Sequence, residues 1–556
     1  MDEGPPNLKT DEQCVNSTEK AESDSEKSTS EKSPTTIGDE EKANWAELLL
    51  LCIPIALISF LVWLDETILA TAIPKISDEF DSFSQIGWYG PAYLFGLCTF
   101  QLPFGQVYKD FPPRLTYLVS LLIFEAASIL QAAAPSSSAF IVGRVFAGIG
   151  GSGVLAGSLT LFSEDIPKSR LPYIMGSFSW VHILGSIAGP IIGGAITTSS
   201  LTWRWCFYLN PIISAAMIGP VIILWRKKLT QMPKHKQDAQ NIPTPYQSLA
   251  NIDHIGIVVF AGAVTSLLLG LQYGGSVYSW SDRRTIACLV IGVALSLGFV
   301  LIEWWKGDDA IVPPQVIRDR VVVLASIFTA TLDGAYFIVT YQVPIWFQVV
   351  QDLSASNSGY HILPLLACCV MGTMAGTTLT GMLRYYHPFM ILGAVLLTIG
   401  SGVLIKLQPG GDVSVWVPSE ILCGAGTGLA TALPLLAVQD VLPPAQVSIG
   451  YAVVLSAGYL GSSIALAISQ AIFVSQLKLD LGRKLPQVDP NGIVHAGVTD
   501  LRSVVPPRLY QETLQIYNIA LNKGWYVAVA LAGLSVLLAL CFPWKKMDMK
   551  DKKGGR

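Results

Sequence analysis

The sequence predicts an all-α integral membrane protein, and three observations lead to that fold class. The chain has 556 residues, of which 51% are hydrophobic and only 14% are charged, and its mean hydropathy is +0.49. Soluble globular proteins carry about 25% charged residues. The apolar residues gather in long segments, and about 20 apolar residues suffice to cross a bilayer as a helix. The chain is therefore expected to cross the membrane many times.

The stretch before the first apolar segment has a different character. Residues 1–45 hold 12 acidic and five basic residues and are rich in Ser and Thr. Such a composition cannot bury enough apolar surface to fold, so we expect a disordered tail. It lacks a basic start followed by an apolar core, so it does not resemble a cleavable signal.

Fourteen segments are predicted to span the membrane as helices. In chain order they are residues 46–72, 86–107, 115–134, 139–161, 172–198, 205–225, 255–273, 284–304, 321–350, 360–382, 387–407, 414–438, 447–473 and 522–543. An even number of crossings places both termini on the same side.

The basic residues predict which side that is. The segments after even-numbered spans, with the C-terminal tail, hold 19 Lys or Arg, whereas the short segments on the opposite face hold five. Because cytoplasmic loops are enriched in Lys and Arg, both termini are predicted to be cytoplasmic. Residues 474–521 are then a long extracellular loop, and such loops cross regardless of their charge.

An internal repeat is indicated by identities at one spacing. Three pairs of residues lie 276 positions apart: Gly148 with Gly424, Pro167 with Pro443, and Gly185 with Gly461. The offset equates the fourth span with the twelfth and the fifth with the thirteenth, as in a parallel duplication of six spans. Two such bundles describe a secondary transporter that alternates access between its halves.

The repeat divides the chain into predicted regions. They are the cytoplasmic tail at 1–45, an N-terminal six-helix bundle at 46–225, a cytoplasmic linker at 226–254, two extra transmembrane helices at 255–304, a C-terminal six-helix bundle at 321–543, and a basic cytoplasmic tail at 544–556.

The segment GSIAGPIIGGAI, residues 185–196, places four glycines and a proline inside an apolar helix. In water each Gly would cost about 1 kcal/mol relative to Ala, but in lipid helices pack through small residues that let their backbones approach. Two adjacent stripes result: Gly185, Gly189 and Gly193 on one, and Ser186, Pro190 and Gly194 on the other. Pro190 is expected to kink the helix. The face serves either packing alone or the rearrangement of helices.

This segment resembles the antiporter motif in the fifth helix of drug:proton antiporters of the major facilitator superfamily. Five further segments resemble motifs of the 14-spanning branch: LDETILATAIP (64–74), GWYGPAYLFGLCTFQLPFG (87–105), IVGRVFAGIGGSG (141–153), WRWCFYLNP (203–211) and TYQVPIWFQVVQDLSASNSG (340–359). The likeness runs from about residue 45 to 545 and is similar to fungal toxin and multidrug efflux pumps. It implies proton-driven export without a cofactor.

The loop after the second predicted helix departs from the family pattern. The segment FGQVYKDFPPRLTY keeps Gly105 and Arg114 of the gating motif but carries Lys109-Asp110 and Pro112-Pro113 instead of the usual Asp, Arg and paired basic residues. The gating salt bridge that the family implies is therefore in question for this chain.

Ionisable residues inside spans are costly and mark functional sites. Asp65 lies 18 residues beyond Glu47, or about 27 Å along a helix, in the outer half of the first span. The family resemblance implies a role in proton coupling, with Arg144 of the fourth span as its partner; the alternative is a solvated helix end. Glu66 points about 100° away and is predicted to face solvent.

Further polar and aromatic residues in the spans are candidate sites. Glu125 and Asp333 are buried acids that could bind a proton or the substrate, and His182 is expected to be a hydrogen-bonding core residue. A set of aromatic and amide side chains could line a cavity for an amphipathic ligand: Trp88, Tyr93, Gln101, Tyr341, Trp346, Phe347 and Gln348. Core packing or an interfacial belt is the alternative.

These features favour a proton-coupled secondary transporter that exports small amphipathic organic molecules, such as a toxin, secondary metabolite or drug. The alternative is a transporter of an iron-siderophore complex or another polar solute. No GxxxxGK[ST] loop or HExxH motif occurs, which argues against an ATP-driven pump and an enzyme. The net charge of −4 gives no basis for nucleic-acid binding. We expect a monomer surrounded by membrane lipid, in the plasma membrane or, as the alternative, the vacuolar membrane.

Overall fold

A computed structural model describes residues 1, 4, 45–80, 86–167, 170–199, 201–231, 253–274, 278–307, 310–353, 355–411, 413–487 and 505–547. The chain divides into two compact units, Met1–Leu51 and Cys52–Arg556. The predicted disordered tail falls almost wholly outside the described residues. So do residues 232–252 of the predicted linker and residues 548–556 of the predicted C-terminal tail.

The described elements are α-helices, with one short 3₁₀ helix and one isolated bridge between Gly274 and Tyr278. Up to residue 231 the helices are α2 (Trp45–Phe80), α3 (Ile86–Tyr89), α4 (Pro91–Asp110), α5 (Pro113–Ala132), α6 (Ser137–Asp165), α7 (Leu171–Thr198) and α8 (Trp205–Gln231). Their starts carry recognisable signals: proline lies in the first turn of α4, α5 and α7, and Ser136 caps α6 by accepting from the backbone N–H of Ala139.

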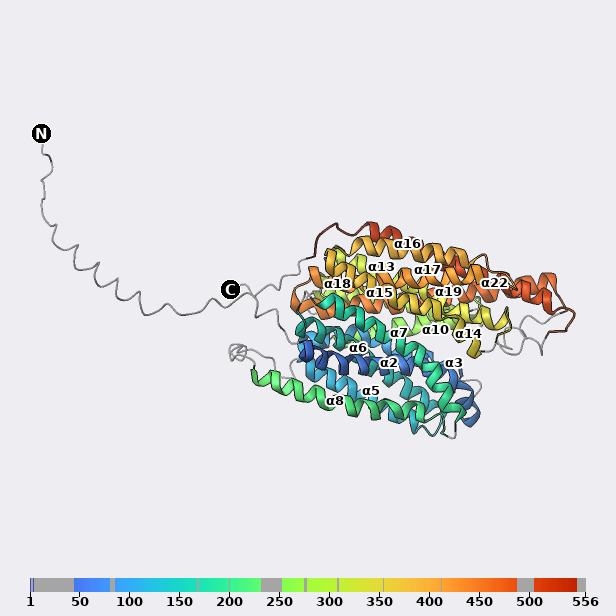
Figure 1. The fold of residues 1–556 in the computed structure, drawn as a ribbon, viewed down its shortest axis with the longest axis horizontal. Coiled ribbons are helices and arrows are strands. Elements are labelled where there is room, and N and C mark those ends of the chain that lie inside the picture. Colours follow the sequence, from blue (N-terminus) through green and yellow to red (C-terminus); the bar gives the residue numbers. More distant parts are fainter. Residues whose placement is uncertain are drawn as a thin grey trace. The chain divides into compact units, whose positions relative to one another are not determined.

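The remaining helices follow the same pattern. They are α10 (His254–Tyr273), α11 (Arg283–Lys306), α12 (Pro314–Arg318), α13 (Arg320–Val349), α14 (Ala355–His361), α15 (Leu363–Leu383), α16 (His387–Leu404), α17 (Val413–Thr431), α18 (Leu433–Val441), the 3₁₀ helix η4 (Pro444–Gln446), α19 (Val447–Lys484) and α22 (Tyr510–Leu540). Figure 1 shows α5, α6 and α8 lying together, and α13, α16, α17 and α22 lying together.

Twelve helices in the described part of the chain are long and apolar enough to cross a membrane. The predicted second and sixth spans, which correspond to α4 and α8, are not among the twelve. Helix α4 contains Gln101, Gln106, Lys109 and Asp110 and so has lower hydropathy, and the apolar stretch found among the described residues of α8, Trp205–Gly219, is shorter than in the twelve. Both helices are nevertheless long, with 20 and 27 residues.

Three helices extend well beyond the predicted spans. Helix α2 continues past residue 72 to Phe80, α19 continues past 473 to Lys484, and α22 begins at Tyr510 rather than at 522. The predicted loop at 474–521 is therefore helical at both ends. The extensions are amphipathic: Leu477 and Leu481 are buried between charged residues, and Phe473 packs against Tyr517 of α22 with ring centroids 5.0 Å apart. The mean hydropathy of a window falls where charged residues appear, so it does not detect an amphipathic extension of a helix.

Helix packing recurs in the two parts of the chain. Helix α6 packs against α4 and α5, and α17 packs against α15 and α16; α5 also packs against α8, as α16 does against α22. The end of α5 is capped when Arg204 donates to the carbonyls of Ala132 and Ala134. The end of α16 is capped in a similar way. Asn518 and Asn522 donate to the carbonyls of Ile405 and Leu407, which lie 273 positions after those of Ala132 and Ala134. The two parts of the chain therefore resemble each other in how the ends of α5 and α16 are capped.

Two seams join the predicted halves. At one seam α7 packs against α15, where Gly176 lies against the side chain of Thr377. At the other α4 packs against α19, where Gly105 lies against Ala452. Helix α10 packs against both α4 and α19 and so covers the second seam. Its hairpin partner α11 is largely exposed and apolar.

Candidate functional site

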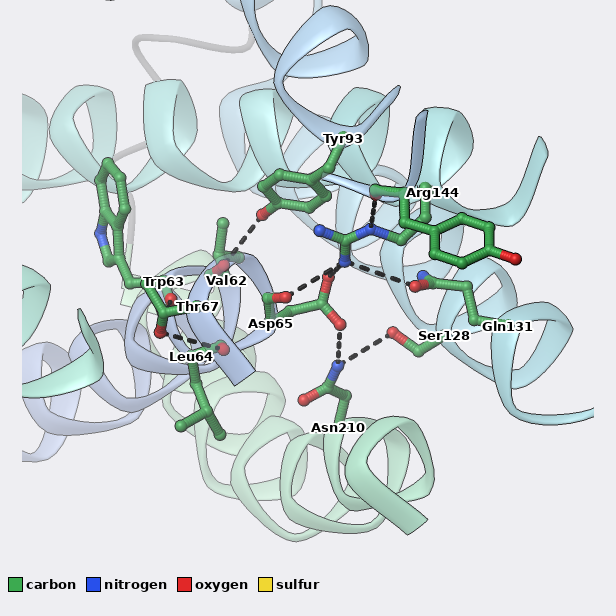
Figure 2. A network of polar contacts seen from close by, with 11 residues as sticks. Val62, Trp63, Leu64, Asp65, Thr67, Tyr93, Ser128, Gln131, Arg144 and Asn210 are labelled. Atoms are coloured by element: carbon green, nitrogen blue, oxygen red, sulfur yellow. Dashed lines mark hydrogen bonds and ion pairs between the residues drawn. The ribbon is translucent and has the colours of Figure 1, made fainter. Parts of the chain in front are cut away.

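A buried ion pair lies at the centre of the helices up to residue 231. Nη1 of Arg144 on α6 donates to Oδ2 of Asp65 on α2 across 2.6 Å, and also to the Asp65 backbone carbonyl across 3.1 Å. Both side chains are 0% exposed. Figure 2 shows the two groups facing each other between their helices. The structure therefore places Arg144 against the carboxylate of the first predicted span.

Other helices complete the surroundings of this pair (Figure 2). The amide of Asn210 on α8 donates to Oδ1 of Asp65 at 3.0 Å and to Ser128 of α5 at 3.1 Å. Arg144 also donates to the Tyr89 carbonyl at 3.1 Å, and its guanidinium lies 4.5 Å above the ring of Tyr93. Both carboxylate oxygens of Asp65 therefore accept a hydrogen bond from a side chain of another helix.

The pair depends on close helix approach. Gly148 of α6, one turn beyond Arg144, lies against the backbone of Tyr93 and Leu97 on α4, where a Cβ would collide. Small residues of this kind let membrane helices pack backbone to backbone. An isolated buried charge would be very costly, so each member of the pair is tolerated because the other is there.

A second carboxyl group lies near the pair. Glu125 on α5 accepts a short hydrogen bond from the hydroxyl of Ser214, one turn beyond Asn210 on α8, and interacts electrostatically with Asp65. Its Oε2 has no hydrogen-bond partner among the described residues. The polar groups therefore run from Arg144 through Asp65 and Asn210 toward Glu125.

The glycines of the 185–196 segment pack against α2 on either side of Asp65. A Cβ at Gly185 would collide with Trp63, and one at Gly189 with Thr67. The Thr67 hydroxyl donates to the Gly185 carbonyl at 3.3 Å. Gly193 is buried, whereas a Cβ at Gly194 would meet nothing within 4 Å. Helix α7 is continuous through the segment, and the side chain of Pro190 lies outside the described parts.

Other expectations near α2 fare differently. Glu66, predicted to face solvent, is partly buried and interacts electrostatically with Tyr341 of α13 and Tyr459 of α19. Glu66 is therefore not a fully solvated residue at a helix end, because α2 continues beyond it for several turns with buried residues. His182 packs on Trp63 with ring centroids 3.8 Å apart. Glu66 is thus a polar residue between the halves that sequence reasoning assigned elsewhere.

The predicted cavity residues do not form one group. Trp346 and Phe347 have almost no exposed surface, and Trp346 donates to Asn518 at 2.7 Å. Tyr93 is likewise buried and donates to the Val62 carbonyl. Three more lie apart: Trp88 against Tyr273 of α10, Gln348 beside Ser358, and the fully buried Gln101, whose side-chain polar atoms have no partner among the described residues. Tyr341 remains accessible, at 60% exposed.

The predicted gating loop makes contacts within and between the halves. Arg114, at the start of α5, pairs with Asp165 at the end of α6 at 3.2 Å. Gly105 lies against Ser448, Ile449 and Ala452 of α19. The altered motif therefore still contains an arginine that forms an ion pair, and its glycine packs at the α4–α19 seam.

Asp333 on α13 lies in the other predicted half. The Asp333 carboxylate lies against Gly458 of α19, at a position where a Cβ on that glycine would contact it. Tyr336 and Tyr459 are near enough to interact electrostatically with this carboxylate. No ion pair to Asp333 occurs among the described residues. The structure does not bring Asp333 into the Asp65 network.

Outside the spans, Glu79 near the end of α2 binds the start of α8. Arg204 donates to it at 2.7 Å and the indole of Trp203 at 2.5 Å. Partial burial opposes the charge, but these hydrogen bonds and the Arg204 charge outweigh it and lower the pKa of Glu79. The contact ties the end of α2 to α8.

The family model described as Major Facilitator Superfamily matches residues 55–466. The chain is 36% identical over 540 residues to the MFS-type efflux pump MFS1 of Trichophyton rubrum, covering 96% of this chain and 99% of that protein. It is 35% identical to the efflux pump roqT of Penicillium rubens, covering 91% of this chain and 92% of that pump. It is 36% identical to the efflux pump aflT of Aspergillus parasiticus, covering 90% and 96%.

Solved structures share the fold at low sequence identity. The proton:xylose symporter XylE superposes with a TM-score of 0.56 at 14% identity, covering 90% of this chain and 96% of that one. The human organic anion transporter MFSD10 gives a TM-score of 0.53 at 12% identity, covering 88% and 99%. From the family match, the extent of the relatives and the shared helical fold, the chain belongs to the Major Facilitator Superfamily and is a multi-pass membrane transporter, not an enzyme.

Proposed function

We propose that this protein is a proton-coupled exporter of small amphipathic organic molecules, such as toxins, secondary metabolites or drugs. Export is supported by the relatives that are named efflux pumps and by the motif at residues 185–196. The observation that carries proton coupling is the buried pair of Asp65 and Arg144. A carboxylate that is neutralised by one arginine and flanked by a glycine-packed helix can link a proton to a helix movement.

The proposed switch follows from the charges. While Asp65 is ionised, its attraction to Arg144 joins α2 to α6. A proton on Asp65 removes that attraction and leaves Arg144 short of a counter-charge, so the arrangement that suits the pair is no longer favoured. Gly185 and Gly189 place α7 directly against α2 at this level, so a shift of α2 is passed to α7 and on to the α7–α15 seam. Glu125 is the proposed next proton site, because one of its oxygens is uncommitted.

The available energy is sufficient. One pH unit is worth about 1.4 kcal/mol per proton, and 100 mV adds about 2.3 kcal/mol. The sum supports a gradient of a neutral substrate of roughly 500-fold per proton. No nucleotide is needed for such work.

The topology that we propose has fourteen crossings. Helices α4 and α8 are included with the twelve more apolar helices, because each packs among them as α15 and α22 do in the other half. The arrangement is two six-helix bundles with the α10–α11 hairpin between them. By the distribution of basic residues both termini are cytoplasmic. The proposed working form is a monomer in lipid, at the plasma membrane, with the vacuolar membrane as the alternative.

The test uses a host that lacks its own efflux pumps. Cells that express the protein are loaded with a panel of amphipathic compounds, and retention is compared before and after an ionophore pair collapses the pH difference and the voltage. We expect efflux that stops on collapse. Efflux that continues at full rate afterwards would reject proton coupling, and uptake of a labelled siderophore complex that requires the protein would favour the polar-solute alternative.

A further inference from the structure

A second ionisable side chain is fully enclosed in the other predicted half. Glu420 lies in the first half of α17, its side chain is 0% exposed, and neither carboxyl oxygen has a hydrogen bond of normal geometry within the described residues. The backbone N–H of Leu365, in the first turn of α15, is the group that interacts with it. Unlike Asp65, this carboxyl has no cation paired with it in the part of the chain that the structure describes.

The internal repeat gives this position a counterpart. Glu420 lies 276 positions after Arg144, which is the offset that relates Gly148 to Gly424. One turn earlier, Phe140 corresponds to Trp416 at the same offset. Both glutamate and arginine are completely buried, and both helices pack against the corresponding neighbours. The second half therefore has an acid where the first half has the base of its ion pair.

The polar neighbours of Arg144 on α5 are only partly repeated on α16 beside Glu420. In α5, Ser128 and Gln131 contact the Asp65–Arg144–Asn210 network; 273 positions later α16 has Ser401 and Leu404. The Ser401 hydroxyl contacts the thiol of Cys423, one turn beyond Glu420. The serine is thus kept, and the amide of Gln131 is replaced by the aliphatic side chain of Leu404.

Among the residues that the structure describes, none forms an ion pair with Glu420, and Lys406, between α16 and α17, is exposed. Arg320 of α13 and His387 of α16 start their helices, at the opposite end from the start of α17. The other titratable groups on the packed elements that the structure describes are neutral or acidic: Cys368 and Cys369 of α15, Cys423 of α17, Asp333, Tyr336 and Tyr341 of α13, Asp440 of α18, and Tyr360 of α14. His361, also on α14, contacts the ring of Trp416, one turn before Glu420 on α17.

Burial without a partner fixes the protonation state. Taking an unpaired carboxylate out of water costs so much that the group is neutralised instead. Glu420 therefore holds a proton in the conformation described. It would release that proton only where a rearrangement admits water or a cation.

An aromatic layer lies one helical turn from this carboxyl. Trp416 has ring contacts with Phe347 at 5.0 Å and with His361 at 5.2 Å, and those two rings are 5.0 Å apart. The three come from α17, α13 and α14. His361 is partly exposed and its Nδ1 contacts the Asn357 carbonyl at 2.8 Å. Separation of these three helices at this end would open a path to Glu420.

We propose that Glu420 is a second proton-binding carboxyl, which holds its proton in the conformation described and releases it when the Phe347–His361–Trp416 layer opens. The release step rests on the proposed function, since it requires an alternating cycle. The binding step does not, because it follows from burial and the missing partner.

The first test measures protonated carboxyl groups directly. Infrared spectra of the purified protein at neutral pH are compared for wild type, Glu420→Gln, Glu420→Asp and the exposed control Glu512→Gln. We expect the wild type and Glu512→Gln to share a protonated-carboxyl band that Glu420→Gln lacks and that Glu420→Asp retains at a shifted frequency. An unchanged band in Glu420→Gln would overturn the proposal. Should that variant not fold, an unshifted band in Glu420→Asp would overturn it equally.

The second test counts protons. Proteoliposomes with a pH indicator in weak buffer report protons exchanged per transported molecule, and we expect Glu420→Gln to exchange one fewer than wild type while still exchanging cargo at equal concentrations. An unchanged count would overturn the release step. If wild type itself moves no protons, the proposed function fails, yet the infrared test still decides whether Glu420 binds one.

Discussion

Gly189 of α7 lies directly against Thr67 of α2, in a contact too close for any Cβ. Gly185 makes the same kind of approach to Trp63, so the two glycines bracket Asp65 along α2. The small-residue face of α7 therefore holds the helix that carries the buried carboxylate. Packing and proton chemistry meet at one level of the fold.

Gly189→Ala is expected to impair transport strongly. The added methyl group would collide with Thr67 and the backbone of Ile68, and such overpacking costs about 1–3 kcal/mol. The measurement is efflux rate per molecule of protein in the membrane. Gly194→Ala is the matched control, because its methyl group meets nothing within 4 Å, and it should transport like wild type. Equal loss in both variants would show that helix propensity, not the contact with α2, matters.

Asp65→Asn is expected to abolish proton-driven efflux and to lower stability. The change leaves Arg144 buried without its counter-charge, and breaking such a pair costs about 3–5 kcal/mol. The double variant Asp65→Asn with Arg144→Gln removes both charges and should recover much of the thermal stability in detergent without recovering proton-driven efflux. If Asp65→Asn alone showed proton-driven efflux at the wild-type rate, Asp65 would have no role in coupling.

Glu125→Gln is expected to fold normally and to alter the dependence of efflux on pH. The amide can still accept from the Ser214 hydroxyl, so the hydrogen bond to α8 is kept while the titratable group is lost. Efflux measured across external pH values distinguishes the two roles of this residue. A purely structural glutamate would give a pH profile that coincides with that of wild type, and Ser214→Ala would then be the more harmful change.

The contact of Glu79 with Arg204 and Trp203 should make stability depend on pH. Because these partners hold the pKa of Glu79 below its ordinary 4.5, the contact stabilises the fold at neutral pH. That contribution is lost as the pH falls through the lowered pKa. Thermal unfolding in detergent should therefore show wild type above Glu79→Gln at neutral pH, with the gap closing in acid. A gap that is constant with pH would mean that the charge is not involved.

Much of the fold could be predicted because lipid demands long apolar helices. The starts of α5, α6 and α16 lie within two residues of their predicted positions. The prediction did not reach the ends of helices that continue beyond the apolar stretch, as α19 does to Lys484. In that extension buried leucines alternate with charged residues, which lowers the mean hydropathy. Hydropathy likewise gives less weight to α4, whose glutamines face the protein interior.

The candidate site was less predictable, since it depends on which helix faces meet. Asp65 and Arg144 are conspicuous in the sequence because they are charged residues within apolar segments. The resemblance to the family predicts that they form a pair. Nothing in the local sequence separates Glu66, which lies between the halves, from a solvated residue. Trp346 and Phe347 look like ligand-binding aromatics but are enclosed by packing. Glu420 lies inside the predicted span 414–438, so the rule that drew attention to Glu125 and Asp333 could have identified it as well.

The α10–α11 hairpin makes the two sides of the molecule unequal. It covers the line where α4 meets α19, while the line where α7 meets α15 has no such cover among the described helices. In a bilayer, hydrocarbon chains would therefore border the α7–α15 contact directly, whereas α10 lies over the α4–α19 contact. A hydrophobic compound dissolved in the membrane would meet α10 on the side of α4 and α19. On the side of α7 and α15 it would reach the contact between those two helices directly.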